Sequence, residues 1–347
     1  MKDHRQKRLV TMCAFVIAAA AALAAGVVFA KNAASERQRT FEFTYQVRVP
    51  ATVESKGEER LWIPLPQTDE HQSIRRLAIE SRVAHEVGRE QEYGNSYAVF
   101  HPTPEQAASG YDIALHFEVT RHEYARDLQA TKAKTPQATE AMMRRYLEPD
   151  KMVPLNATIA ELARAQTAGA TEPMAKARRI YDYVASTMRY DKSGEGWGRG
   201  DEMWACDSKR GNCTDFHSVL IGMMRSSGIP ARFEIGFPLP AGKSEGDISG
   251  YHCWAEFYVK GIGWVPVDAS EASKNPAKRD YFFGAVDADR VMFTYGRDIR
   301  LSNQQRGESL NYFIYPYAES NGQAVKGFTT HFAFRDLAPP GSTGPGN

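Results

Sequence analysis

The chain is predicted to have an α+β fold, because strand and helix patterns occur in separate parts of the sequence. Within residues 40–122 several segments alternate apolar with polar residues, which is the periodicity of half-buried strands. From about residue 125 apolar residues recur every three or four positions, which indicates helices. Residues 252–268 return to alternation around a glycine turn and predict a β-hairpin. We therefore expect a small all-β domain at 40–122 and a mixed domain at 125–335.

The N-terminal region is expected to be an antiparallel sheet or a small sandwich. Residues 40–49 and 111–119 each place five apolar residues on one face, and shorter candidates lie between them around residues 61–65, 74–80 and 97–100. Nothing catalytic is arranged there. The region's five histidines have no ligand spacing, and we interpret them as surface or packing residues: His71, His85, His101, His116 and His122.

Helices are predicted at 136–147, 157–166 and 171–190, each with one apolar stripe that faces a core. The glycine-rich segment 191–200 follows. It lacks the Gly-Lys-Ser/Thr sequence of a phosphate-binding loop, so we interpret it as a flexible wall of a substrate cleft. Aromatic-rich segments between residues 281 and 334 are expected to be further strands that complete the sheet of the second domain.

Cys213 is predicted to begin a helix. The residues after it are apolar at helical spacing, and the run ends at Gly228, with Pro230 behind it. Unpaired backbone N–H groups and the positive end of the helix dipole favour a thiolate at such a position. The backbone N–H of Cys213 would be one donor of an oxyanion hole, whereas Trp197 and Trp204 match an indole donor too loosely to be assigned.

His252 begins the alternating segment HCWAEFYV, and Asp268 ends the segment that returns after the glycine turn. An antiparallel hairpin of this length brings Asp268 level with the start of the first strand, although its register is left open. Thiol, imidazole and carboxylate then have the chemistry of a nucleophile, a proton carrier and an orienting group.

The segments GNCTDF, GIPAR, YHCWAEFY and GWVPVDAS together resemble the core of the transglutaminase-like superfamily, whose fold is related to papain-type cysteine proteases. The resemblance spans about residues 146–317. It implies a helix bundle that carries the nucleophile and packs on an antiparallel sheet. It also implies Cys213 as nucleophile, His252 as general base and acid, and Asp268 as orienting carboxylate, with no cofactor.

The expected function is that of an exported cysteine-dependent hydrolase, resembling a protease or amidase, that acts on peptide or protein acyl groups through a thioester. The sequence has no recognisable calcium loop, which favours hydrolysis over cross-linking. Alternatives are a protein-glutamine acyltransferase that cross-links, and a non-catalytic binding module of the same fold. A metal site is disfavoured, because its candidate residues are not spaced along the chain as zinc ligands are. These residues are Cys206, Cys213, His217, His252 and Cys253.

The N-terminus predicts export. Four basic residues precede the apolar run 9–30, which is either a signal peptide cleaved after Ala30 or an uncleaved membrane anchor. Either alternative places residues 31 onward in the periplasm or outside the cell. The tail 338–347 is rich in proline and glycine and is predicted to be disordered.

Cysteine count and charge complete the sequence evidence. Three cysteines follow residue 30, and if Cys213 stays free, Cys206 and Cys253 could form a disulfide; alternatively, Cys253 is a buried strand residue. The 43 basic and 42 acidic residues nearly balance, which gives no support to nucleic-acid binding.

Overall fold

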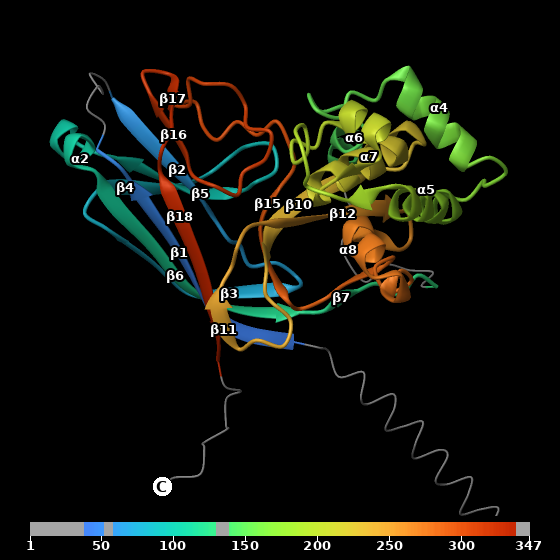
Figure 1. Cartoon of the computed structure of the whole chain (residues 1–347), viewed down its shortest axis with the longest axis horizontal. Helices are drawn as coiled ribbons and strands as arrows, with labels where there is room; N and C mark the ends of the chain where they lie inside the picture. The colour runs from blue at the N-terminus through green and yellow to red at the C-terminus, as the bar shows by residue number, and fades with distance from the viewer. Residues whose placement is uncertain (1–37, 52–57, 130–138, 338–347) are drawn as a thin grey trace, which may run out of the picture. The chain divides into compact units, whose positions relative to one another are not determined.

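The structure, a computed structural model, describes residues 38–51, 58–129 and 139–337 (Figure 1). The predicted export segment 1–30 and the predicted tail 338–347 lie outside the described residues. Sheets of β-strands occupy one side of the view and helices gather on the other, around a third sheet.

The first sheet contains five strands in the order β11-β18-β1-β6-β3. All neighbouring strands in it are antiparallel. Along β1, alternate residues from Phe41 to Val49 are buried, which confirms the predicted strand. The strands of this sheet are β11 (Glu245–Asp247), β18 (Thr329–Asp336), β1 (Gln38–Val49), β6 (Tyr111–His122) and β3 (Gln72–Ser81).

The second sheet has the order β17-β16-β2-β5-β4 and shares one apolar core with the first, to which Phe43 of β1 and Leu61 of β2 both belong. The short helix α2 (Pro104–Ser109) precedes β6. The strands of this sheet are β17 (Gln323–Val325), β16 (Tyr317–Ser320), β2 (Glu59–Leu65), β5 (Ser96–His101) and β4 (Ala84–Arg89).

The third sheet has the order β13-β12-β10-β15 and carries the predicted hairpin. Val259 pairs with Gly263 and Ala255 with Val267, so the two strands run antiparallel as expected. The chain leaves β13 one residue before Asp268. The strands are β13 (Gly263–Val267), β12 (His252–Val259), β10 (Ala231–Pro238) and β15 (Arg290–Tyr295).

Helix α7 (Cys213–Ser226) is the central helix, and every residue from Cys213 to Arg225 is buried. It contacts β12 and β10 on one side and the helices α4, α5, α6 and α8 around it. The predicted helix 157–166 is confirmed. The other helices beyond residue 139 are α3 (Glu140–Arg145), α4 (Ala157–Gln166), α5 (Pro173–Thr187), α6 (Glu202–Ser208), α8 (Ala269–Lys274) and the 3-10 turn η1 (Pro276–Lys278).

Two short ribbons complete the fold. Strands β8 (Arg189–Tyr190) and β9 (Arg210–Gly211) pair in parallel just before α7. Strands β7 (Tyr124–Ala125) and β14 (Ala285–Val286) pair antiparallel.

The expectation that the late strands complete the sheet of the second domain is wrong for most of them. Only β15 joins the third sheet, whereas β16 pairs with β2 and β18 pairs with β1. Strand periodicity is local and carries no information about the partner strand, so the sequence could not distinguish these pairings. The described residues between 38 and 337 belong to one compact unit, and the division into domains at 40–122 and 125–335 stays a prediction.

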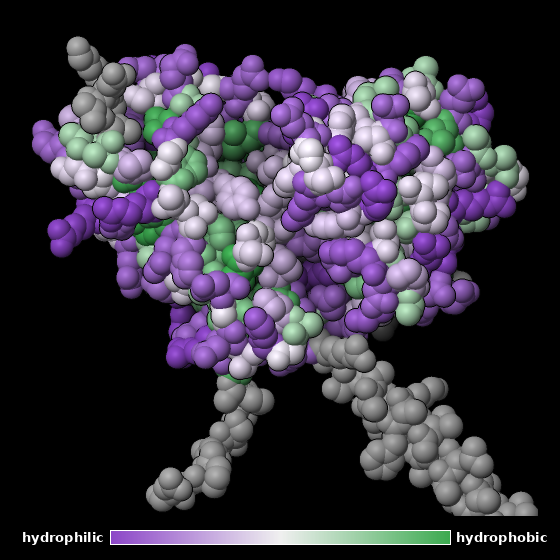
Figure 2. All heavy atoms as spheres, in the orientation of Figure 1, coloured by the Kyte–Doolittle hydropathy of each residue, from purple (hydrophilic) through white to green (hydrophobic). Residues whose placement is uncertain are grey.

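The visible surface is largely hydrophilic (Figure 2). Among the described residues, the exposed large apolar side chains are Leu77, Val87 and Met203. No helix in the described ranges is long and apolar enough to cross a membrane.

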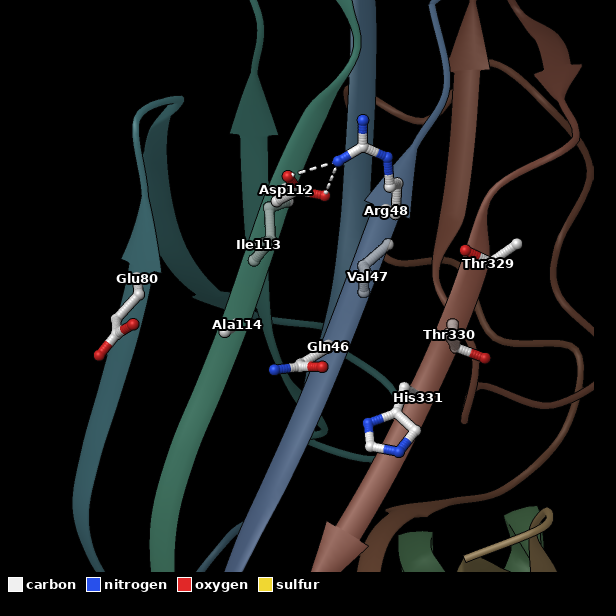
Figure 3. A pocket seen from close by; sticks show the side chains of 10 residues that line it. All are labelled: Gln46, Val47, Arg48, Glu80, Asp112, Ile113, Ala114, Thr329, Thr330 and His331. Carbon is white, nitrogen blue, oxygen red and sulfur yellow. Dashed lines mark hydrogen bonds and ion pairs between the residues drawn. The ribbon is translucent and has the colours of Figure 1, made fainter. Parts of the chain in front are cut away.

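A hollow of about 450 Å³ lies on the first sheet (Figure 3). Its lining includes the exposed ion pair of Arg48 with Asp112, whose shorter N–O distance is 2.7 Å, together with Glu80 and His331. None of its lining residues is one of the predicted site residues.

Candidate active site

Cys213 is the first residue of α7, as predicted. Asn212 caps the helix, because its side-chain oxygen accepts a hydrogen bond from the backbone N–H of Thr214 at 2.9 Å. The carboxylate of Asp215 in turn accepts a hydrogen bond from the backbone N–H of Asn212 at 2.9 Å. This capping box fixes the direction in which the chain enters the helix. The thiol of Cys213 therefore lies at the positive end of the helix dipole, and the residue is only 2% exposed.

His252 is the first residue of β12 and pairs with Gly236 of β10. Its Nε2 forms a hydrogen bond of 2.7 Å with Oδ2 of Asp268. Because Nε2 faces Asp268, Nδ1 is the nitrogen that remains for the sulfur of Cys213.

Asp268 is the N-cap of α8 and is fully buried. Its Oδ1 accepts from the backbone N–H of Glu271 and from the hydroxyl of Ser270, both at 3.0 Å. Its Oδ2 is shared by His252 and by Nη1 of Arg290 at 3.2 Å. Both oxygens are thus held by donors, which fixes the carboxylate for the imidazole.

The electrostatics of the three side chains favour separated charges. Burial opposes ionisation of Asp268, but the charge and hydrogen bond of His252 and the charge of Arg290 hold its pKa well below its usual value. Burial lowers the pKa of His252, yet Asp268 and Cys213 together raise it to about 10. Burial likewise disfavours a thiolate, but the neighbouring side chains of Cys253 and His252, together with the charge of the imidazolium, hold the pKa of Cys213 well below its usual value. A thiolate–imidazolium pair at neutral pH follows.

His217 contacts the backbone at the start of α7 and at the start of α8. Its Nδ1 lies 2.8 Å from the carbonyl oxygen of Cys213, and the backbone N–H of Ala269 donates to its Nε2 at 3.2 Å. Burial lowers its pKa. A neutral ring whose Nε2 accepts a hydrogen bond cannot form an ion pair, so the 3.7 Å separation from Oδ1 of Asp268 is a packing contact. The sequence indicated only a supporting role for His217.

The glycine-rich segment is tied to the start of α7 by Asp215. Its carboxylate accepts from the backbone N–H groups of Gly198 at 2.6 Å and Gly200 at 3.0 Å, in addition to that of Asn212. Of the two candidate indole donors, Trp197 donates to the carbonyl of Gly194 at 3.0 Å. The segment is thus anchored beside the nucleophile.

Tyrosines surround the start of α7. The hydroxyl of Tyr251 lies 2.9 Å from Nδ2 of Asn212 and 2.8 Å from Oγ1 of Thr214, and its ring centroid lies 5.6 Å from that of Tyr312. Tyr312 in turn donates to the carbonyl of Gly198 at 3.3 Å. These contacts join residues far apart in the chain around the buried thiol.

The cysteines correct one hypothesis. In the described part of the chain Cys206, Cys213 and Cys253 are free thiols, so the disulfide between Cys206 and Cys253 is not formed. Cys206 lies on α6, with its Sγ 3.7 Å from Nζ of Lys209. The thiol of Cys253 points instead toward α7, with its Sγ 3.6 Å from Nδ1 of His217. Within the described ranges no group of three or more His, Cys, Asp or Glu side chains could hold a metal ion.

The structure therefore brings Cys213, His252 and Asp268 together, while their catalytic roles stay a prediction. Sequence reasoning missed Arg290, which lies on β15, 22 residues beyond Asp268. No sequence signal marks it, because its place beside Asp268 comes from the pairing of β15 with β10.

An α+β fold that joins a buried cysteine at a helix start to a histidine on the adjoining sheet and an aspartate at the start of a second helix has the arrangement of papain-related thiol folds. Residues 160–269 match the family described as the transglutaminase-like superfamily. This part of the chain is therefore a transglutaminase-like domain, as the sequence resemblance implied, and the predicted fold class is confirmed.

Individual proteins show the same relationship. An uncharacterized protein of Haemophilus influenzae is 28% identical over 324 residues, which cover 83% of this chain and 87% of that protein. The protein YebA of Bacillus subtilis is 28% identical over 117 residues, or 30% of this chain and 16% of YebA. The crystal structure of a candidate cysteine protease from Cytophaga hutchinsonii matches with a TM-score of 0.60 and 14% identity, over 88% of this chain and 92% of that one. At this identity the match concerns the fold alone.

Proposed function

We propose that the protein is an exported cysteine-dependent hydrolase that acts on amide or peptide acyl groups through a thioester. The observation that supports this best is the buried arrangement of Cys213, His252 and Asp268. Its hydrogen bonds and charges favour a thiolate beside an imidazolium. A purely structural module has no need of a cysteine whose pKa is lowered in this way.

The first half of the proposed reaction forms the thioester. The thiolate of Cys213 attacks the carbonyl carbon, and the backbone N–H at the start of α7 donates to the oxygen that becomes negative. When the tetrahedral intermediate collapses, the imidazolium of His252 gives its proton to the leaving amine. Asp268 holds the ring in place and stabilises its charge throughout.

The second half releases the acid. The neutral ring of His252 takes a proton from water, and the hydroxide attacks the thioester carbonyl. Collapse breaks the carbon–sulfur bond and returns the thiolate of Cys213 and the imidazolium of His252. An amine in place of water would give a transferred product, which is the chemistry of the alternative cross-linking function.

The substrate class and the compartment are part of the same proposal. A peptide or protein substrate is expected from the amide chemistry. Export to the periplasm or the cell exterior is expected from residues 1–30, which act either as a cleaved signal or as a membrane attachment through residues 9–30.

The decisive experiment measures how fast iodoacetamide alkylates each cysteine of the purified native protein at pH about 6, with peptide mass spectrometry as the readout. An ordinary thiol with a pKa of about 8.5 reacts slowly at this pH. We expect rapid labelling of Cys213, slow labelling of Cys206 and Cys253, and slower labelling of Cys213 in His252→Ala.

One further result would support the proposed function, and another would contradict it. Once a hydrolysed peptide or amide substrate has been found, Cys213→Ala should abolish its turnover while leaving the circular dichroism spectrum unchanged. Labelling of Cys213 no faster than that of Cys206 would contradict the proposed function and favour the non-catalytic binding module.

A further inference from the structure

His217 is a buried side chain between two backbone segments of the site, and the mechanism described so far does not use it. It lies on α7, one helical turn beyond Cys213, and is fully buried. Its Nδ1 lies 2.8 Å from the carbonyl oxygen of Cys213, and its Nε2 lies 3.2 Å from the backbone nitrogen of Ala269. One ring therefore contacts both the residue that carries the nucleophile and the residue that follows Asp268.

The two partners of the ring determine which of its nitrogens carries a hydrogen. A carbonyl oxygen can only accept, so Nδ1 must carry a hydrogen and donate it to Cys213. A backbone N–H can only donate, so Nε2 must present its lone pair to Ala269. The ring of His217 is therefore neutral with its single hydrogen on Nδ1. The lowering of its pKa by burial agrees with this state.

The contact with Ala269 matters because Ala269 is the first residue of α8 and Asp268 is the N-cap of that helix. The first N–H groups of a helix have no partner within the helix. In α8 the carboxylate of Asp268 accepts from the N–H of Glu271, whereas the imidazole accepts from the N–H of Ala269. The ring thus completes the cap of α8 from another helix, directly beside the orienting carboxylate.

A hydrogen on Nε2 of His217 would disturb this arrangement. It would face the N–H of Ala269, so that two donors would meet without an acceptor between them. If the ring were charged, it would also attract Oδ1 of Asp268, which lies 3.7 Å from Nε2. The titratable groups around the ring come from α7, from β12 and from the residue before α8: Cys213, His252, Cys253 and Asp268.

We propose that His217 is a positioning residue, whose neutral ring ties the start of α7 to the start of α8 and thereby sets where Asp268 lies relative to Cys213. The inference rests on the proposed function, because it concerns the same three side chains. Asp268 orients His252 through the 2.7 Å hydrogen bond, so a shift of α8 would weaken that bond. Loss of the tie should therefore lower the pKa of His252 and raise the pKa of Cys213.

The first test needs no substitution in the protein that is measured. The native protein is labelled at histidine with the heavy nitrogen isotope, and the NMR shifts of the ring nitrogens report which of them carries a hydrogen. At pH about 7 we expect a protonated Nδ1 and an unprotonated Nε2 for His217, whose signals are assigned by their loss in His217→Gln. A hydrogen on Nε2, alone or together with one on Nδ1, would overturn the inference.

The second test compares His217→Asn with His217→Gln in the full-length protein. Asparagine reaches only the position of Nδ1, so it keeps a donor for the carbonyl of Cys213 and loses the contact with α8. Glutamine is longer by one carbon and can present its amide oxygen to the N–H of Ala269. The rate at which iodoacetamide alkylates Cys213 is measured from pH about 4 to pH about 9.

The two variants should differ in this profile. In His217→Asn we expect the apparent pKa of Cys213 to rise by about one unit, because the imidazolium that stabilises the thiolate is held less well. The labelling rate in the acid range then falls roughly tenfold. In His217→Gln we expect a profile close to that of the wild-type protein.

Ser218→Ala is the matched control. Ser218 is the next residue of α7, is buried, and donates its hydroxyl hydrogen to the carbonyl of Asp215 at 2.8 Å. The variant loses a buried hydrogen bond of α7 that does not involve α8. Its alkylation profile should therefore equal that of the wild-type protein.

Each other result has a definite meaning. An unchanged profile in His217→Asn, or a shift equal to that in Ser218→Ala or in His217→Gln, would overturn the inference while leaving the nucleophile intact. An ordinary pKa of Cys213 in the wild-type protein would instead overturn the proposed function. If His217→Asn does not fold, the NMR measurement on the native protein decides the inference through the position of the hydrogen.

Discussion

Arg290 donates from Nη1 to the same carboxylate oxygen of Asp268 that contacts His252, at 3.2 Å. Arg290 is buried, also contacts Asp287, and lies over the ring of Trp254 with its guanidinium carbon 4.8 Å from the ring centroid. The buried guanidinium of Arg290 thus forms ion pairs with two carboxylates, those of Asp268 and Asp287. Asp268 is therefore part of a charge network and not a single partner of the imidazole.

Removing this cation should destabilise the fold. Arg290→Gln leaves the fully buried Asp268 without its guanidinium partner, and we expect a loss of about 3–5 kcal/mol in the free energy of unfolding. Arg290→Lys keeps the charge but cannot contact both acids as well, so its loss should be smaller. Urea unfolding at pH 7 measures both.

The matched control is Arg48→Gln, because Arg48 and Asp112 form an ion pair in which both side chains are 66% exposed. Exposed pairs of this kind contribute less than about 1 kcal/mol. Equal stability of Arg290→Gln and Arg48→Gln would contradict a structural role for the network.

Asp268→Asn should lower the pKa of His252 from its raised value of about 10, because the carboxylate charge that stabilises the imidazolium is gone. A less positive ring stabilises the thiolate less, so the pKa of Cys213 should rise. Histidine NMR titration measures the first shift, and alkylation of Cys213 against pH measures the second. Turnover of a substrate should fall on the order of 10⁴-fold.

Glu271→Gln is the control for this experiment. The carboxylate of Glu271 lies 3.9 Å from Nε2 of His252, beyond hydrogen-bond distance, and is paired with Lys274. We expect a much smaller change in the pKa of His252 than in Asp268→Asn. A pKa of His252 that does not move in Asp268→Asn would show that the 2.7 Å contact is not an ionic hydrogen bond.

The elements around the candidate site could be predicted because each has a local sequence signal. Cys213 precedes a helix with one apolar face, His252 begins an alternating strand, and Asp268 follows a glycine turn. Helix starts and hairpins depend on residues that are close in the chain, so their patterns are visible in the sequence.

What the sequence could not predict depends on contacts between distant segments. The position of Arg290 requires β15 to pair with β10, and the return of β18 to β1 joins the last described strand to the first. The direction in which the thiol of Cys253 points depends on how β12 packs on α7. Alternation along a strand identifies its two faces but not what covers each face.

Asp215→Asn should release the glycine-rich segment from α7. The carboxylate accepts from the N–H groups of Gly198 and Gly200, and an amide in its place turns one acceptor into a donor that faces N–H groups. We expect a loss of about 1–3 kcal/mol in the free energy of unfolding. Trypsin should also cleave faster after Lys192 and Arg199, which lie in this segment.

Asp207→Asn is the matched control, because Asp207 is an exposed acid on the neighbouring helix α6. Its cleavage pattern should equal that of the wild-type protein. If trypsin cleaves Asp215→Asn no faster than this control, the segment is held by contacts other than those of Asp215.

Glu202 should make the stability of the protein depend on pH. It lies in the first turn of α6, is fully buried, and faces Gly222 of α7 so closely that a Cβ there would collide with its carboxylate. Burial raises its pKa to about 8, although the nearby backbone of Leu155 and the charge of Arg225 oppose the shift. Between pH about 4.5 and pH about 8 the folded chain therefore holds a proton at Glu202 that the unfolded chain has lost.

Stability must consequently fall as the pH rises through this range, by about 3–5 kcal/mol for this group. Glu202→Gln has no proton to lose, so it should remove this part of the pH dependence and be more stable than the wild-type protein at pH 8.5. Urea unfolding at pH 5 and pH 8.5 measures the difference, with the exposed Glu161→Gln on α4 as control. Because every other group titrates equally in the three proteins, identical pH dependence in Glu202→Gln and the wild-type protein would mean that Glu202 ionises in the folded chain with an ordinary pKa.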